Sequence, residues 1–360
     1  MSPPRNPGDA SPDLDTPVVA TWTSDQESSR SARRFVETAL GRGLALVLRI
    51  RDLPVLLVLV AIVTLVSSFH PQYLAAASVI NTARFGAYIG CMSVAMVFLL
   101  SMREIDLSVG AIYGLSAVVA ARLMGDGWNP ALAVAVALLT GCLCGAVNGM
   151  ISNVLRIQTI IVTLGTLSIF GALSLLIAGD QVLVNVPLGS WVFTVLGADF
   201  LGVPASIWTL LVLTAIAHVL YWHTRFGAHV KLIGSNPEAA RLLGIRLGRT
   251  RLLALVLQGL FCAVIGVVTL GYLQAADPTT GIGYELSVIA AAIVGGTALS
   301  GGQGSVIGAV IGAMIISTIS TGLVQFGVTA DWTGFATGAI IIAAVTLDSF
   351  LRRRRLAIRT

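Results

Sequence analysis

Asp106 is the residue best placed for chemistry within the apolar part of this sequence. It lies in Ile105-Asp106-Leu107-Ser108-Val109-Gly110, at the start of a long apolar stretch. An ionisable side chain in such a stretch is a candidate for contacting a polar solute. The alternative is structural, because a carboxylate at a helix start accepts hydrogen bonds from free backbone N–H groups and is favoured by the helix dipole. We expect Asp106 to cap a helix, with Ser108 sharing that role, and solute contact is the alternative for both.

Further polar side chains lie at intervals within the apolar stretches. They are Tyr113, Asn148, Thr163, Thr166 and Ser168. Their hydroxyl and amide groups could hydrogen-bond an uncharged polar solute, and Tyr113 would add an aromatic surface. Thr and Ser in a helix often bond carbonyls of their own helix instead, so a structural role is the alternative for each. Asn148 is the hardest to explain in that way, because a buried amide needs partners.

A polar segment, 223–251, interrupts the apolar sequence and carries six basic residues. Within it, Asn236 can cap a short helix, Pro237 suits the first helical position, and Glu238 complements the positive end of the helix dipole. Leu242, Leu243 and Ile245 would give this helix an apolar face. Such a helix either lies on lipid or docks into a soluble partner, and we favour the partner. The predicted contact residues are Asn236, Pro237, Glu238, Ala239, Ala240, Arg241, Leu242 and Gly244.

One motif is misleading. Leu299-Ser300-Gly301-Gly302-Gln303 matches the signature peptide of ABC ATPases. An ATPase of that class also needs a phosphate loop with a lysine followed by Ser or Thr, but the single lysine of this sequence, Lys231, is followed by Leu232. We interpret the pentapeptide as a glycine-rich turn. We predict that this chain does not hydrolyse ATP by itself and binds no metal or cofactor of its own.

The composition indicates which class of fold must position these polar residues. The chain has 360 residues, of which 56% are hydrophobic and 11% charged, whereas soluble domains have about 25% charged residues. We predict an all-α polytopic membrane protein with about ten transmembrane helices. Because two of the apolar runs are short, the range is eight to ten. The runs are 53–69, 86–101, 107–123, 131–153, 160–178, 204–222, 253–273, 286–297, 304–323 and 334–348.

The charges predict an orientation. With ten spans and a cytoplasmic amino terminus, all but two (Arg84 and Arg122) of the 22 Lys and Arg residues fall on the cytoplasmic side, as the positive-inside rule requires. Residues 1–45 then form a disordered cytoplasmic tail, 46–351 a transmembrane domain and 352–360 a basic cytoplasmic tail. The external loop 179–203 is apolar enough for a short helix at the outer surface. The basic residues are not interleaved with aromatics, so we expect no nucleic-acid partner.

Glycines recur every four residues in two stretches, Gly141-Gly145-Gly149 and Gly304-Gly308-Gly312. Such ridges of small residues let helix backbones approach closely in a bilayer. Further glycines, at 295–296 and 301–302, interrupt the apolar stretch 286–323. We expect a broken span or a tight turn there.

Taken in order, several segments resemble the permease subunits of ribose-type monosaccharide ABC importers, which share a broader family with branched-chain amino acid permeases. The resemblance covers about 50–350. Its marks are Ile105–Gly110, Asn148-Gly149, Ile161–Leu167, Gly234–Arg241, Gly283–Leu286 and Gly295–Ser305. One departure is Arg103-Glu104, where family members often carry Gly-Gly. These two charges would lie at the cytoplasmic edge of the membrane and pair with each other or with a neighbour.

The resemblance implies the fold of type II importers and a permease that works as a pair, with a second copy or a paralogue. Two ABC ATPases carrying ATP and Mg²⁺ would bind from the cytoplasm, and an extracytoplasmic sugar-binding protein would deliver substrate. The helix at Asn236 matches the coupling helix that enters the ATPase. The location would be the bacterial cytoplasmic membrane. Sugar hydroxyls would then meet the candidates Asp106 to Ser168 named above.

Two other classes of protein are alternatives. A secondary transporter driven by an ion gradient would use acidic residues inside the membrane, for which Asp106 is the main candidate. An intramembrane enzyme would need a catalytic constellation, but the four histidines form no H-E-x-x-H pattern. Cys142-Leu-Cys144 is too apolar and too closely spaced for a metal framework, and we interpret the four cysteines as small buried hydrophobic residues.

Overall fold

The computed structural model describes residues 52–328 and, beyond them, residues 332, 334–336, 338–340, 342 and 346. Nearly all of these belong to one unit, Val55–Thr360, and the description below concerns this unit. The predicted tails 1–45 and 352–360 lie outside the described residues. So does much of the predicted span 334–348, although those of its residues that are described are helical.

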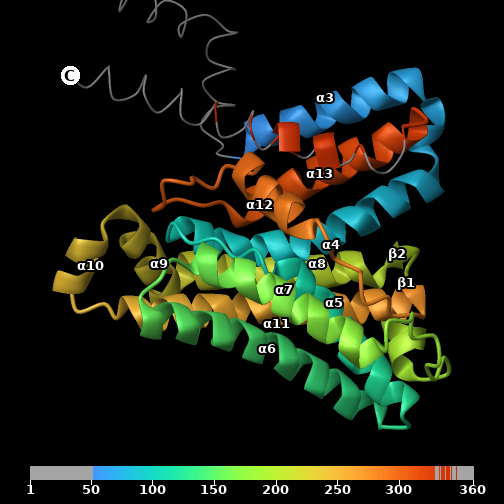
Figure 1. Cartoon of the computed structure of the whole chain (residues 1–360). Helices are drawn as coiled ribbons and strands as arrows, with labels where there is room; N and C mark the ends of the chain where they lie inside the picture. Colours follow the sequence, from blue (N-terminus) through green and yellow to red (C-terminus); the bar gives the residue numbers. More distant parts are fainter. Residues whose placement is uncertain are drawn as a thin grey trace, which may run out of the picture. The chain divides into compact units, whose positions relative to one another are not determined.

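Helices account for nearly all regular structure in the described residues (Figure 1). The helices are α3 (Leu53–Phe69), α4 (Ala76–Ser101), α5 (Val109–Gly125), α6 (Pro130–Leu155), α7 (Thr159–Ala178), α8 (Ala205–His223), α9 (Arg225–Ser235), α10 (Pro237–Leu242), α11 (Leu247–Leu273), α12 (Tyr284–Val294) and α13 (Val306–Gln325). Two single-turn helices, Pro71–Leu74 and Val192–Leu196, and a two-residue hairpin of β1 (Asp199–Phe200) and β2 (Val203–Pro204) complete the list.

Six of these helices, α4, α6, α7, α8, α11 and α13, are long and apolar enough to cross a membrane. Three shorter apolar helices, α3, α5 and α12, coincide with three more predicted spans. The all-α polytopic class is therefore confirmed. The count of about ten spans remains a prediction.

Helix α4 lies at the centre of the unit. Every residue from Gly86 to Ser101 is buried, which is typical of a helix that is apolar on all sides. Figure 1 shows α12 and α13 on one side of α4, and α8 and α11 on the other, and all four pack against it. Helix α4 begins ten residues earlier than the predicted span. The additional turns are more exposed and follow the preceding loop.

The predicted glycine ridges are close helix contacts. A Cβ atom on Gly145 would overlap the backbone carbonyl of Leu255 in α11, and one on Gly308 would overlap the carbonyl of Gly295 at the end of α12. Close backbone approach of this kind replaces the hydrophobic driving force that helices lack within a bilayer. The ridges therefore fix α6 on α11 and α13 on α12.

Helix α12 has only 11 residues, about 16 Å of rise, because the chain preceding it runs alongside another helix. The carbonyl of Thr280 lies against Gly114, and the carbonyl of Gly281 against Gly110, both in the first two turns of α5. Residues 280–281, which lie between two predicted spans, thus pack on α5. The predicted break after this span is confirmed, since α12 ends at Val294 and α13 begins at Val306.

The two ends of the unit differ in charge. One end, called the basic end below, holds the connections 102–108 and 156–158, the segment 223–251 and the turn 295–305. The opposite end holds the loop 179–203, with its predicted short helix present at Val192–Leu196. Val192 and Phe193 are buried in a second apolar cluster with residues of α5, α6 and α11. The loop therefore packs against these helices through buried side chains.

Candidate functional site

Asp106 and Ser108 lie in the connection between α4 and α5, and both are fully buried. One carboxylate oxygen of Asp106, Oδ1, accepts the backbone N–H of Ser108 at 2.8 Å and its hydroxyl at 2.6 Å. Asp106 therefore forms a turn just ahead of α5 and does not bond the N–H groups inside the first helical turn, so its capping role stays a prediction. Ser108 is the N-cap residue of α5, but its side chain makes no capping bond.

Asn148 extends this arrangement to α6 and α7. Its amide nitrogen donates to the Ser108 hydroxyl at 2.8 Å, and its amide oxygen accepts from the Thr166 hydroxyl at 2.7 Å. The Thr163 hydroxyl accepts the backbone N–H of Leu107 at 3.1 Å. Asp106, Ser108, Asn148, Thr163 and Thr166, called the polar network below, are all buried. Five of the seven predicted pathway residues thus meet in one place and link three helices.

The other two predicted residues lie elsewhere. Tyr113 is buried and stacks on Tyr284 of α12, with ring centroids 5.7 Å apart. Its hydroxyl has no hydrogen-bond partner among the described residues. Ser168 is exposed on α7, on the side away from the polar network.

The second oxygen of Asp106 has no hydrogen-bond partner among the described residues. Burial raises the pKa of this carboxyl group to about 6, although the two hydrogen bonds from Ser108 act in the opposite direction. A burial-raised pKa of this kind means that the protonated form is accessible near neutral pH. The network can therefore hold a proton as well as a charge.

The basic segment 223–251 is more helical than predicted. The predicted short helix is α10, and Asn236 caps it by accepting the backbone N–H groups of Glu238 at 3.0 Å and Ala239 at 3.1 Å. Sequence reasoning missed α9, which precedes it. Thr224 caps α9 through Gly227 N–H at 3.3 Å. The spacing of Phe226, Val230 and Ile233 in α9 would have indicated an amphipathic helix.

Helix α10 points its larger apolar side chains away from the unit. Leu242 is 90% exposed and the following Leu243 is 70% exposed, whereas Ala240 is buried. Leu242 and Leu243 thus form a small exposed apolar surface on a charged segment. Glu238 and Arg241 flank them and are not part of any ion pair among the described residues.

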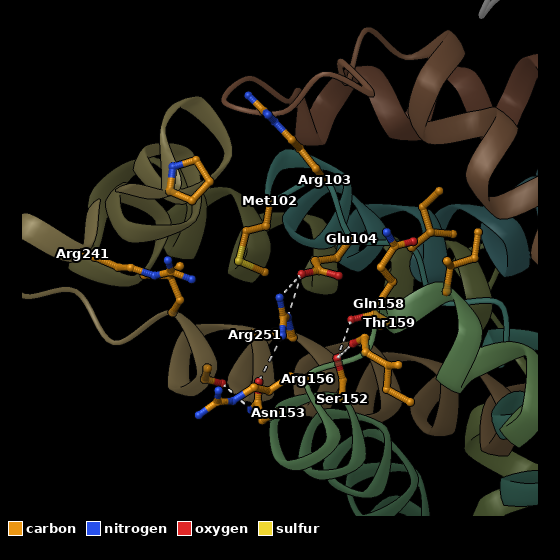
Figure 2. Close-up of a pocket in the computed structure, with 16 residues that line it drawn as sticks. Met102, Arg103, Glu104, Ser152, Asn153, Arg156, Gln158, Thr159, Arg241 and Arg251 are labelled. Carbon is orange, nitrogen blue, oxygen red and sulfur yellow. Dashed lines mark hydrogen bonds and ion pairs between the residues drawn. The ribbon is translucent and has the colours of Figure 1, made fainter. Parts of the chain in front are cut away.

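A cavity of about 780 Å³ lies at the basic end, between α10 and the ends of the long helices (Figure 2). Below it is called the basic cavity. It is lined by Met102, Arg103, Glu104, Ile105, Ser152, Asn153, Arg156, Ile157, Gln158, Thr159, Ile160, Pro237, Arg241, Leu247, Gly248 and Arg251. These residues come from α6, α7, α10 and α11 and from the α4–α5 and α6–α7 connections, so the cavity exists only in the folded chain.

An ion pair crosses the basic cavity. The guanidinium of Arg251 lies 2.5 Å from the Glu104 carboxylate through Nη2, and its Nε donates to the same oxygen at 2.7 Å. Arg251 also donates to the Asn153 amide oxygen at 3.3 Å. Figure 2 shows Arg251 between Glu104 and Asn153. Glu104, one of the two charges at the Arg103-Glu104 departure, thus pairs with a residue of the basic segment.

Arg103 does not pair with Glu104. Its guanidinium donates to the backbone carbonyl of Ser235 at 3.3 Å, at the end of α9. Its backbone is left-handed, with φ 65°, a conformation in which a residue other than glycine is strained. A glycine would adopt this conformation without strain, so Arg103 is a strained position of the α4–α5 connection.

The pentapeptide Leu299–Gln303 is the turn between α12 and α13, as predicted. Gly301 and Gly302 have positive φ values of 77° and 80°. Gly302 N–H donates to the carbonyl of Ser101 at 2.8 Å. The peptide therefore fixes the turn to the end of α4, beside Arg103.

Comparison with known proteins gives one family and a consistent set of relatives. Residues 78–345 match the family described as "Branched-chain amino acid transport system / permease component". The ribose import permease protein RbsC of Escherichia coli K12 is 32% identical over 296 residues, which cover 82% of this chain and 92% of the relative. RbsC of Bacillus subtilis is 34% identical, with 80% of this chain and 89% of the relative covered.

The L-arabinose ABC transporter permease protein AraH of Azospirillum brasilense is 31% identical over 335 residues, or 93% of this chain and 98% of the relative. No solved structure was found to match the sequence. The residues that match the family, 78–345, include the polar network, the basic segment and the turn at Leu299–Gln303.

Proposed function

Because this chain belongs to the branched-chain amino acid transport system / permease component family, we propose that it is the membrane-spanning permease subunit of an ATP-driven importer of a monosaccharide. The observation that carries the proposal is similarity along at least four fifths of the chain to permeases named for ribose and L-arabinose. The substrate class is a pentose or a related small sugar or polyol. Hydroxyl and amide groups, such as those at Asn148 and Thr166, suit an uncharged solute better than fixed charges do.

The proposed orientation places the basic end in the cytoplasm of a bacterium and the protein in the cytoplasmic membrane. The positive-inside rule supports this, because the connections at that end carry most of the described basic residues. Both chain termini would then be cytoplasmic. The loop 179–203 faces outward in this arrangement, where an extracytoplasmic sugar-binding protein would deliver substrate.

The proposed partners follow the same logic. Two permease copies, or this chain and a paralogue, would form the pathway between them, and ATP and Mg²⁺ would be bound by separate ATPase subunits and not by this chain. Helix α10 would enter a cleft of the ATPase. Its cap at Asn236 and the exposed side chains of Leu242 and Leu243 support that role.

The test combines uptake and co-purification. Cells that lack the gene are complemented with wild type or with Glu238→Lys, and entry of labelled ribose, xylose, arabinose, galactose and inositol is measured. We expect wild type to restore uptake of one sugar class and to co-purify with an ABC ATPase in near-equal amount. Glu238→Lys should insert normally but lose both uptake and the ATPase.

The matched control is Asp180→Lys, the same charge reversal at an exposed residue of the opposite end. It should retain the ATPase. Normal uptake by Glu238→Lys would contradict the docking role of α10. Purification of the wild-type chain without any ATPase, even after cross-linking, would contradict the importer itself and favour an ion-driven carrier.

A further inference from the structure

The charge balance of the basic cavity is strongly positive. Four arginines, Arg103, Arg156, Arg241 and Arg251, line it against a single carboxylate, that of Glu104. Glu104 is already paired with Arg251, and Arg103 donates to a backbone carbonyl. Arg156 and Arg241 have no acidic partner among the described residues. Two guanidinium groups therefore remain available to an anion.

The backbone around the cavity adds to this positive potential. Helix α7 begins at Thr159 on the cavity wall, and its N-cap residue Gln158 makes no side-chain capping bond. The start of a 20-residue helix carries a partial positive charge, and its first N–H groups suit an anion. Figure 2 shows Gln158 and Thr159 beside the Glu104–Arg251 pair.

The cavity is also partly apolar. Met102, Ile105, Ile157, Ile160 and Leu247 contribute to its wall. Ile160 is 37% exposed and lies next to the outward face of α7. On that face, Ile161 and Leu164 are 57% and 58% exposed. Apolar side chains this exposed on a helix long enough to cross a membrane face lipid or another helix. A continuous apolar surface thus leads from the side of the membrane helices to the arginines.

We propose that the basic cavity binds an anionic phospholipid, with its phosphate headgroup at Arg156 and Arg241 and its glycerol and first acyl carbons against Ile157 and Ile160. The cavity lies at the ends of membrane helices, the depth at which phospholipid headgroups are found, and basic pockets between helices on the cytoplasmic side suit such headgroups. A free phosphate ion would use the arginines but not the apolar wall. The proposal concerns this chain alone and does not depend on the transported sugar.

The occupant would be in contact with one functional element, because Arg241 belongs to α10. A bound headgroup would neutralise Arg156 and Arg241 and so hold α10 toward the helix ends. The lipid would thereby stabilise α10 in the position that the structure shows.

The test is lipid binding to the purified full-length chain, delipidated in nonionic detergent, by native mass spectrometry. Dioleoylphosphatidylglycerol is the anionic probe, and dioleoylphosphatidylcholine is the zwitterionic probe with the same acyl chains. We expect wild type to retain the anionic lipid preferentially, and its binding to weaken as ionic strength rises. The double variant Arg156→Gln/Arg241→Gln should bind it about tenfold less tightly or weaker.

The matched control is Arg225→Gln/Arg249→Gln, which removes the same charge from exposed positions of the basic segment that do not line the cavity. It should bind as wild type does. Arg156→Lys/Arg241→Lys, which keeps the charges, should retain most of the binding and guards against a folding defect in the Gln pair.

Three results would overturn the proposal. Equal retention of the two lipids would show that charge is not recognised. Unchanged binding by the Gln pair would place the anionic lipid elsewhere. Displacement of the lipid by inorganic phosphate at about 10 mM, a concentration that barely alters screening, would show that the site takes a free anion. None of these results bears on uptake or ATPase binding, so each is distinguishable from failure of the proposed function.

Discussion

Arg251 and Glu104 are 147 residues apart in the sequence, yet the Nε atom of Arg251 lies 2.7 Å from the Glu104 carboxylate. The pair joins the first turns of α11, in the basic segment, to the connection between α4 and α5. Two residues beyond Glu104 lies Asp106, the first member of the polar network. The ion pair therefore connects the basic segment to the connection that leads into the polar network.

Breaking this ion pair should destabilise the protein. The side chains of Arg251 and Glu104 are 28% and 14% exposed, so removal of one charge leaves the other largely desolvated. We expect Glu104→Gln to cost about 1–3 kcal/mol of unfolding free energy, measured as thermal unfolding in detergent. The exchange Glu104→Arg/Arg251→Glu should recover part of the loss.

The control for this prediction is Arg122→Gln, which breaks an ion pair with Asp126 in which both side chains are about half exposed. An exposed pair contributes about 1 kcal/mol or less. If Glu104→Gln melts no differently from this control, the buried pair has no special structural role.

Asn148 should be the least replaceable member of the polar network. Asn148→Ala removes two hydrogen bonds at once, one to the Ser108 hydroxyl and one from the Thr166 hydroxyl. Because hydrogen bonds between membrane helices contribute about 0.6–1.7 kcal/mol each, we expect a loss of about 1–3 kcal/mol. Thr140→Ala is the control on the same helix, since Thr140 bonds only the Val136 carbonyl of α6, and it should be nearly neutral. Equal losses for the two variants would contradict a linking role for Asn148.

Asp106 should make stability depend on pH. Burial raises the pKa of its carboxyl group to about 6, above the ordinary value of about 4 that it regains on unfolding. Its favourable contribution is therefore complete below about pH 4 and is lost as the pH rises through about 6. The melting temperature of wild type should fall between pH 4 and 7 relative to that of Asp106→Asn. Parallel curves for the two proteins would show that this carboxyl group does not titrate in the folded state.

Gly145 should tolerate no side chain. Gly145→Ala would place a Cβ atom on the Leu255 carbonyl and force α6 away from α11, so we expect reduced folded yield and a lower melting temperature. Gly171→Ala is the matched control within α7, where a Cβ atom would meet nothing within 4 Å. It should be neutral or slightly stabilising, because alanine favours a helix by about 1 kcal/mol over glycine. A normal yield of Gly145→Ala would mean that α6 and α11 can separate without cost.

The amino-acid sequence by itself determined the class of protein, the approximate positions of the described apolar helices, the cap of α10 and the close-packing role of the glycines. These depend on hydropathy, period and turn chemistry over a few residues, as at Asn236 and Gly145. Sequence reasoning missed α9, although the spacing of its apolar residues would have indicated it. The packing of residues 280–281 on α5 could not be predicted, because it depends on a helix distant in the sequence.

Only the tertiary structure decided which polar residues meet. Asp106, Asn148 and Thr166 lie on separate elements, and the sequence shows that each needs a partner without showing which one. The same holds for Arg251 with Glu104 and for the basic cavity, whose walls come from six segments. Contacts of this kind are set by how the helices pack and rotate against one another, a property of the whole fold that no local pattern encodes.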